Sequence, residues 1–216
     1  IGALVIAAAG FAATLTGAET LILPLGLPDL PFHLRIDPLS GFFLFLLGAV
    51  SAGISVFAAG YLRPAEEVAG HSSPGLQCLC YHLFLASMAL VLIADDAYGF
   101  MVYWETMALS SYFLVVSDHA KAEIRRAGFL YLLIAHLGAV AILLCFGVLQ
   151  GGTGDYSFDA IRNATHTPFW GTVAFALALA GFGAKAGLLP LHVWLPEAHP
   201  AAPSPASALM SAVMLK

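Results

Sequence analysis

Charged residues are scarce in this chain of 216 residues: Asp, Glu, Lys and Arg make up 10% of it, whereas hydrophobic residues make up 60%. A soluble domain carries about 25% charged residues, because its surface must face water. This chain has too little charge to cover such a surface. We therefore expect lipid to be its solvent.

Basic residues are also few, with 8 Lys and Arg against 13 Asp and Glu, for a net charge of -5. A protein that binds nucleic acid needs a basic face to displace counterions from the phosphates. The composition therefore excludes nucleic acid as a partner.

The chain has 3 cysteines, Cys78, Cys80 and Cys145. They are too few for a disulfide framework, and Cys78 and Cys80 lack a second pair of ligands at zinc spacing. The spacing typical of haem, flavin or iron–sulfur sites is missing as well. We interpret the cysteines as small buried apolar residues and expect no cofactor and no resident metal.

What the chain does have is seven apolar runs, separated by clusters of Pro, Gly and charge. A helix needs about 20 residues to cross the hydrocarbon core. The pattern predicts an all-α membrane protein: one polytopic bundle of transmembrane helices over residues 1–216. The predicted helices cover residues 1–17, 40–62, 78–94, 97–117, 127–149, 169–198 and 205–216.

The connectors between these runs are expected to be loops, including the Pro-rich segment 18–39. The sixth helix is expected to be broken, because Gly187, Pro190 and Pro196 interrupt it. The chain opens at Ile1 without a basic region before its first apolar run, which argues against a signal peptide. Because the seventh run stops at Lys216 before reaching a membrane-spanning length, we expect a fragment truncated at both ends.

Positive charge is distributed unevenly over the connectors, and cytoplasmic loops carry the excess in membrane proteins. Arg35 and Arg162 lie on one side of the predicted membrane. The other side carries Arg63, Lys121, Arg125 and Arg126. We therefore expect the loop from Lys121 to Arg126 to be cytoplasmic.

Three charged residues, Glu105, Lys185 and Lys216, fall inside apolar runs. Each charge near the centre of a bilayer costs about 2.5 to 3.5 kcal/mol. Mutual pairing, a wet cavity or neutralisation must offset that cost, and each places the groups inside the bundle. One interpretation is a proton relay. The other is a static ion pair between Glu105 and Lys185, with Lys216 reaching toward the membrane surface.

Histidines accompany these charges. His136 lies near the middle of the fifth run, where an imidazole could pass protons or could simply be a neutral group bonded to a neighbouring helix. Discontinuous helices of ion-coupled transporters expose free backbone groups to wet pockets. We therefore expect a cavity at the break of the sixth helix, formed by Pro190, His192, Pro196 and His199.

Three segments carry a resemblance to a known family. They are GFGAKAGLLPLHVWLPEAHP at 181–200 with its continuation AAPSPASALMS, WETMALSSYF at 104–113 and FLYLLIAH at 129–136. The chain resembles the antiporter-like membrane subunits of respiratory complex I and of energy-converting hydrogenases. AHPAAPS and SALMS are most similar to the branch of hydrogenase-4 component B and formate hydrogenlyase subunit 3.

The resemblance implies a proton-translocating subunit in which Glu105 pairs with Lys185 and Lys216 passes protons onward. It also implies a fold of two inverted five-helix repeats, of which this chain holds the first, from Cys78 to Lys216, with its last helix incomplete. The implied partners are lipid, protons, other membrane subunits, and peripheral hydrogenase or quinone-reductase subunits. The implied location is the cell membrane.

Two alternatives stay open. A multisubunit sodium/proton antiporter shares the same fold, and a membrane anchor for a hydrogenase would need no transport at all. In each case we expect a subunit without a redox site of its own, because no such site emerges from the sequence.

Overall fold

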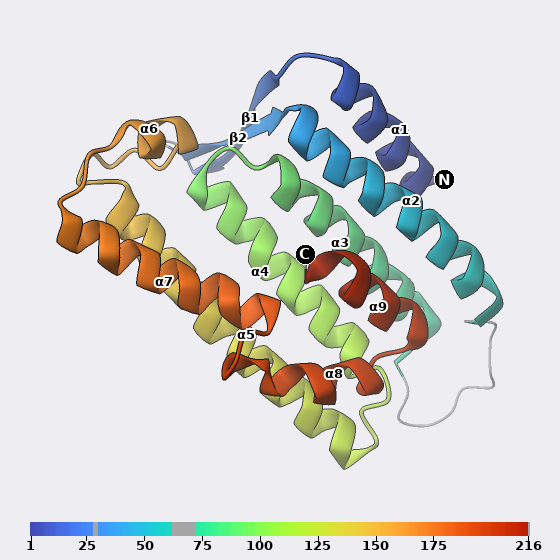
Figure 1. Cartoon of the computed structure of the whole chain (residues 1–216). Coiled ribbons are helices and arrows are strands. Elements are labelled where there is room, and N and C mark those ends of the chain that lie inside the picture. The colour runs from blue at the N-terminus through green and yellow to red at the C-terminus, as the bar shows by residue number, and fades with distance from the viewer. Residues whose placement is uncertain (28–29, 62–71, 216) are drawn as a thin grey trace.

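The computed structural model describes residues 1–27, 30–61 and 72–215 (Figure 1). Arg63 and Lys216, both singled out above, lie outside the described residues. The helices are α1 Gly2–Leu15, α2 Pro38–Tyr61, α3 Pro74–Ile93, α4 Ala97–Val115, α5 Ala122–Leu149, α6 Phe158–Asn163, α7 Pro168–Ala186, α8 Leu195–Ala201 and α9 Ser204–Leu209. A 3₁₀ turn, η1 Leu191–Trp194, precedes α8, and a π-helical segment, η2 Met210–Met214, follows α9.

Within the residues that the structure describes, four helical segments are long and apolar enough to cross a membrane. They are Pro38–Tyr61, Pro74–Ile93, Ala122–Leu149 and Pro168–Ala201. Much of their surface is apolar and faces outward: on α5 the exposed side chains include Leu133, Leu137, Val140 and Leu144, which follow helical spacing along one face. The predicted all-α membrane-spanning class is thereby confirmed.

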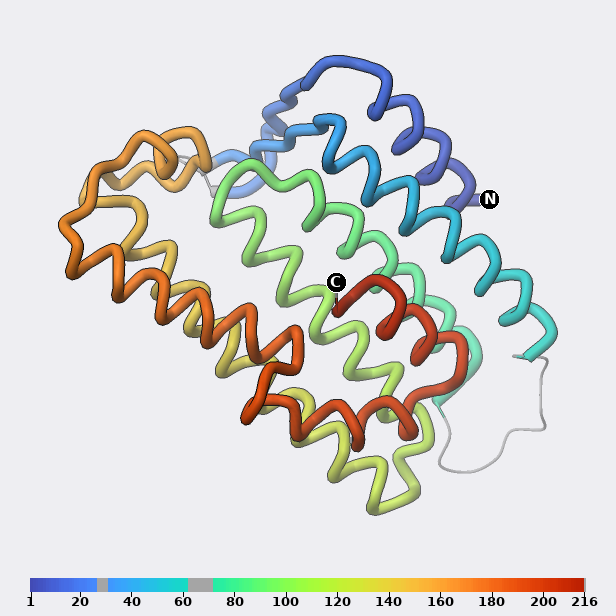
Figure 2. The backbone as a smooth tube through the Cα atoms, viewed as in Figure 1, coloured from blue at the N-terminus to red at the C-terminus, as the bar shows by residue number. Residues whose placement is uncertain are grey.

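The helices pack as antiparallel neighbours, α1 on α2, α3 on α4 and α5 on α7, and the chain ends with α9 against α2 and α4 (Figure 2). Glycines permit the closest of these contacts. A Cβ atom at Gly181 of α7 would lie 2.7 Å from the carbonyl oxygen of Gly138 and 2.5 Å from Ile142 Cγ1, both on α5. Small residues at such contacts are typical of helix packing in membranes.

Segment 18–39 is not the loop that the prolines suggested. Strands β1 Glu19–Leu27 and β2 Leu30–Ile36 form an antiparallel hairpin, with Glu19 opposite Ile36 and Leu23 opposite Phe32. Pro24 is tolerated because it falls where the register shifts, between Leu23 and Gly26. The prolines therefore masked a strand signal that the apolar and β-branched residues of β1 carry.

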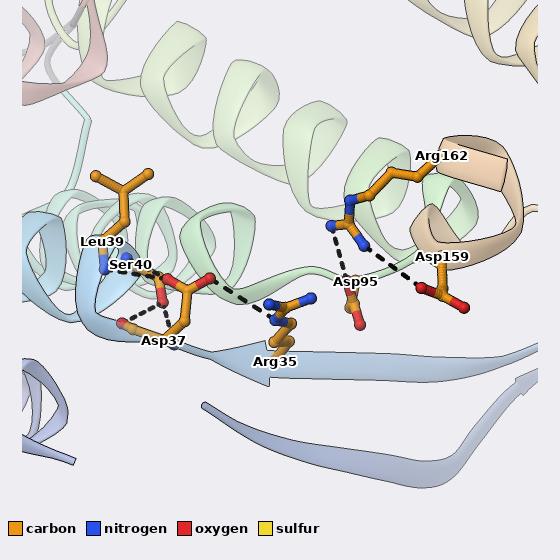
Figure 3. A network of polar contacts seen from close by, with 7 residues as sticks. All are labelled: Arg35, Asp37, Leu39, Ser40, Asp95, Asp159 and Arg162. Carbon is orange, nitrogen blue, oxygen red and sulfur yellow. Dashed lines mark hydrogen bonds and ion pairs between the residues drawn. The ribbon is translucent and has the colours of Figure 1, made fainter. Parts of the chain in front are cut away.

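The hairpin, the α3–α4 turn and α6 meet at one end of the bundle (Figure 1). Figure 3 shows the polar contacts of this end: Asp37 accepts hydrogen bonds from the backbone N–H of Leu39 and Ser40 at the start of α2. The Arg162 guanidinium of α6 lies 3.7 Å from a carboxylate oxygen of Asp95. Short α6 is not among the predicted helices. The residue before it, Ser157, caps it, because its hydroxyl accepts a hydrogen bond from the Ala160 N–H.

Asp96 is the buried member of this polar end. Its carboxylate accepts hydrogen bonds from the backbone N–H of Gly99, in the first turn of α4, and of His33 on β2, at 2.5 and 2.7 Å. A side-chain acceptor before a helix satisfies backbone donors that have no partner within the helix. Asp96 thus joins the hairpin to the start of the helix that carries Glu105.

Candidate functional site

Lys185 lies in the last turn of α7 and is buried, with 7% of its surface exposed. Its Nζ atom stands 5.5 Å from the ring centroid of Trp104 on α4 and 5.9 Å from that of Tyr131 on α5. Nζ has no hydrogen-bond partner within the described residues. Two aromatic faces therefore provide the surroundings of this ammonium group, an arrangement that attracts a cation through the ring quadrupoles.

The chain places Lys185 there because α7 ends one residue later, at Ala186. Gly187 adopts a left-handed conformation with φ of 73°, and Leu188 N–H donates to the Gly183 carbonyl at 2.9 Å. This is the hydrogen-bond pattern of a Schellman cap. The Trp194 indole N–H donates to the Ala184 carbonyl at 2.9 Å. Two carbonyls at this helix end, those of Gly183 and Ala184, are therefore satisfied without water.

A cavity of about 290 Å³ opens beside Lys185. Its walls come from α3, α4, α7 and the C-terminal segment, and Lys185 is the charged residue among the described residues that line it. The apolar lining consists of Met88, Val91, Leu92, Trp104, Met107, Phe182, Ala186, Val213, Met214 and Leu215. The last three precede Lys216 directly in the chain, although Lys216 itself lies outside the described residues.

Glu105 follows Trp104 on α4, and its carboxylate contacts a different partner. Glu105 Oε2 lies 3.5 Å from His136 Nε2 on α5, and 32% and 49% of the two side chains are exposed. The other ring nitrogen of His136 lies 3.1 Å from the Leu132 carbonyl oxygen. Among the described residues Glu105 forms no ion pair with Lys185, which differs from the direct pairing that the resemblance implies.

The residues at the interruption after α7 lie apart from this cavity. His192 Nδ1 is buried without a hydrogen-bond partner among the described residues, and His199 Nδ1 lies 3.2 Å from the Ser207 hydroxyl. Pro190 precedes η1, and Pro196 lies in the first turn of α8. None of the four lines the cavity beside Lys185, so a cavity formed by these four residues stays a prediction.

Tyr131 and Ser111 were not among the predicted site residues. Tyr131 is 1% exposed, Ser111 is fully buried, and their hydroxyl oxygens lie 2.6 Å apart. The sequence signal that could have indicated them is a polar hydroxyl inside an apolar run, which both residues carry. The sequence could not give their pairing, which depends on how α4 and α5 face each other. The part of the chain that the structure describes holds no group of three His, Cys, Asp or Glu residues suited to a metal ion.

Comparison with known proteins gives three kinds of match. The family model described as NADH:quinone oxidoreductase/Mrp antiporter, TM, matches residues 94–216. Hydrogenase-4 component B of Escherichia coli (strain K12) is 43% identical over 183 residues, which cover 85% of this chain and 26% of that protein. Formate hydrogenlyase subunit 3 of the same organism is 30% identical over 216 residues, 100% of this chain and 33% of that protein.

A third relative, the putative antiporter subunit mnhA2 of Staphylococcus epidermidis (strain ATCC 12228 / FDA PCI 1200), is 30% identical over 195 residues, 87% of this chain and 23% of that protein. The chain thus spans about a quarter to a third of the length of these curated relatives.

Two solved structures share the fold. A chain of the membrane-bound sulfane sulfur reductase, an archaeal respiratory membrane complex, superposes with a TM-score of 0.82 at 21% identity, covering 99% of this chain and 43% of that one. A chain of the Mrp complex from Dietzia sp. DQ12-45-1b gives a TM-score of 0.77 at 22% identity, covering 99% and 39%.

Proposed function

Because the chain belongs to the NADH:quinone oxidoreductase/Mrp antiporter family of membrane subunits, we propose that it translocates protons within a membrane-bound hydrogenase or NADH:quinone oxidoreductase-type complex. Relatives named as subunits of such systems support this assignment. In this proposal the complex transfers electrons elsewhere, and this chain moves the protons that the electron transfer drives.

The observation that carries the proposal is the Lys185 ammonium, buried without a hydrogen-bonding partner beside a cavity in a membrane-spanning bundle. A charge in this position is expensive, and a merely structural role would be served as well by an apolar side chain. A group that must gain and lose a proton, however, has to be titratable, and the lysine amine is. The cavity offers room for the water that would receive that proton.

We propose that the Glu105 carboxylate alternates between Lys185 and His136. When the carboxylate is close to Lys185, it stabilises the ammonium form, so the lysine keeps its proton. Turned toward His136, as in this structure, it leaves the ammonium between two aromatic rings. The ammonium then gives its proton to water in the cavity. Movements elsewhere in the complex would set which partner Glu105 takes.

Lys216 is the proposed next acceptor. The cavity beside Lys185 reaches Val213, Met214 and Leu215, which directly precede Lys216. A proton leaving Lys185 toward this wall therefore moves in the direction of the next amine along the chain. His136 is both a proposed relay residue and the alternative partner of the Glu105 carboxylate. The histidines after α7, His192 and His199, are further candidates for the path that the protons take.

The proposed setting is the cell membrane, with the Lys121 to Arg126 loop in the cytoplasm and other membrane and peripheral subunits as partners. The distribution of basic residues supports that orientation. In this loop Lys121 forms an ion pair with Asp118, with 2.6 Å between Nζ and Oδ2. The partner assignment depends on the relatives, which are named as components or subunits of larger systems.

The test uses the full-length protein in its complex, reconstituted into proteoliposomes. Glu105→Gln and Lys185→Ala should each abolish proton translocation, and Lys121→Ala, at an exposed lysine of the α4–α5 connection, should leave it unchanged. Unchanged translocation in both site variants would refute the proposal. If neutralising Lys185 left ion gradients intact while deleting helices disrupted assembly, the chain would be an anchor instead.

A sodium/proton antiporter subunit is the second candidate. The similarity to the putative antiporter subunit mnhA2 and to the Mrp complex fold favours it. Both functions would use Lys185, so the site variants do not separate them. Sodium-dependent pH changes in vesicles, measured without an electron donor, would establish the antiporter, and their absence together with donor-driven pumping would establish the first candidate.

A further inference from the structure

Two buried hydroxyl groups meet across the α4–α5 interface next to the Lys185 site. The oxygens of Tyr131 and Ser111 are 2.6 Å apart, and either atom could be the donor. Ser111 Oγ is also 2.7 Å from the Met107 carbonyl oxygen, and Tyr131 Oη is 3.9 Å from Met214 Sδ. Ser111 Oγ also lies 3.0 Å from the Ala108 carbonyl oxygen. Each hydroxyl therefore has one hydrogen and a choice of acceptors, two for Tyr131 and three for Ser111.

The hydrogens fit two complete arrangements. In the first, Tyr131 donates to Ser111, and Ser111 donates to the Met107 carbonyl. In the second, Ser111 donates to Tyr131, and Tyr131 donates toward Met214. Both hydroxyls stay hydrogen-bonded in either arrangement, so the change between them avoids the cost of an unsatisfied buried polar group.

Neither Tyr131 nor Ser111 lines the cavity that Lys185 faces, but each contacts a residue that does. Met107 and Met214, the two methionines that the hydroxyls contact, both line that cavity. The ring of Tyr131 lies 5.9 Å from Lys185 Nζ. On the far side, Met214 closes the π-helical segment η2, a rare conformation that is frequent at functional sites.

We propose that Tyr131 is a further proton-relay residue for protons that leave Lys185, and that Ser111 positions its hydroxyl. This inference depends on the proposed proton translocation. The Lys185 ammonium gives a proton to water and becomes an amine. That water gives a proton to Tyr131 Oη while the hydrogen already on Oη passes to a second water beside Met214. One proton has moved from Lys185 to the η2 side, and Tyr131 remains a neutral phenol.

Ser111 works through Tyr131. When the Tyr131 hydroxyl donates to Ser111, no hydrogen points toward η2 and the route is interrupted. When Ser111 donates instead, the Tyr131 hydrogen is free to point onward. Ser111 is thus a positioning residue that makes both orientations of the phenol accessible.

The test is Tyr131→Phe in the full-length protein in its complex, which removes one oxygen and keeps the ring against Trp194 and Lys185. Proton translocation should fall about a hundredfold, in the lower range for a positioned proton-transfer group. Tyr81→Phe is the matched control. Its hydroxyl on α3 is buried with no hydrogen-bond partner among the described residues, so its loss should leave the rate unchanged.

Ser111→Ala should lower the rate by a smaller factor, and the double variant should translocate no more slowly than Tyr131→Phe alone, because Ser111 acts through Tyr131. A merely structural role predicts lower thermal midpoints or incomplete assembly instead. Wild-type rates in both Tyr131→Phe and Ser111→Ala would overturn the relay. If Tyr131→Phe fails to assemble, an assembled Ser111→Ala with a wild-type rate would overturn it.

The same experiment separates the relay from the function on which it depends. Loss of translocation in Lys185→Ala, with wild-type rates in the Tyr131 and Ser111 variants, would refute the relay and leave the proposed function standing. Unchanged translocation in both Glu105→Gln and Lys185→Ala would refute the proposed function and the relay with it.

Discussion

The Glu105 carboxylate meets the His136 imidazole across the α4–α5 interface, with 3.5 Å between Oε2 and Nε2. Lys185, on the adjacent helix α7, has no such partner among the described residues. The Glu105 carboxylate therefore contacts the partly exposed His136 imidazole, whereas the buried Lys185 side chain contacts aromatic rings. This separation within one bundle motivates the first two predictions.

The Glu105–His136 contact should contribute little to stability. About a third of the Glu105 side chain and half of the His136 side chain are exposed. A double-mutant cycle of Glu105→Gln and His136→Gln, measured by unfolding of the purified protein in detergent, should give a coupling free energy below about 1 kcal/mol. A coupling of several kcal/mol would indicate a structural ion pair and argue against a carboxylate that changes partners.

Replacing Lys185 by methionine should stabilise the fold while it abolishes translocation. The substitution exchanges a buried ammonium without a hydrogen-bond partner for an apolar side chain of similar length. Such exchanges of buried charge for apolar groups are often neutral or stabilising by about 1 to 4 kcal/mol. The measurement is the thermal midpoint of Lys185→Met against wild type, with the exposed Lys121→Met as control. A lower midpoint for Lys185→Met would show that the ammonium is structurally required.

Trp194→Phe should destabilise the end of α7. The indole N–H donates to the Ala184 carbonyl at 2.9 Å, and Trp194 is 1% exposed. Its loss leaves a buried carbonyl without that donor, at a cost of about 1 to 3 kcal/mol in unfolding free energy. Trp170→Phe, at a half-exposed position near the start of α7, is the control and should change little. Equal effects of the two substitutions would contradict a specific role for the indole.

Acid should weaken the polar end of the bundle through Asp37. The backbone N–H of Ser40, assisted by the Ser40 hydroxyl and the Arg35 charge, lowers the pKa of the Asp37 carboxyl below its ordinary value. A carboxyl whose pKa is lower in the folded state stabilises that state above the unfolded pKa, and this contribution is lost as pH falls through the folded pKa. Asp37→Ala should therefore cost about 1 kcal/mol near pH 7.

The difference in thermal midpoint between wild type and Asp37→Ala should shrink when the pH is lowered below about 4, where the free carboxyl titrates. Asp159→Ala provides the comparison, since 85% of that side chain is exposed. A difference that stays constant down to the lowest pH at which the protein remains folded would exclude the Asp37 charge as its cause.

The membrane-spanning helices were predictable because the hydrocarbon core leaves a chain few choices. Backbone polar groups must be satisfied internally, so a long apolar run becomes a helix. The segment 127–149 was assigned from this argument, and α5 covers Ala122–Leu149. The helix begins earlier than predicted. Its first turn, which contains Glu123, is polar and lies outside the apolar run, so the prediction did not include it. The hairpin was missed because Pro24 and its neighbours were given more weight than the strand pattern around them.

The site was predictable in its residue types and not in its contacts. Glu105, His136 and Lys185 attracted notice because polar groups inside apolar runs are costly. The contacts among these three residues depend on the rotation of α4, α5 and α7 about their axes and on the side-chain rotamers. Neither can be inferred from the spacing of residues in the sequence. Tyr131 illustrates the limit: its phenol gains significance only from Ser111 and Met214, which are 20 and 83 positions away.

The two hydrogen bonds that Asp96 accepts, from His33 and Gly99, fasten a β-strand and the first turn of α4 to a single carboxylate. Asp96 directly precedes α4, so a shift of the hairpin past this helix has to break the bond from the His33 N–H. A displacement of the hairpin that keeps this bond would therefore move the start of α4, the helix that carries Glu105.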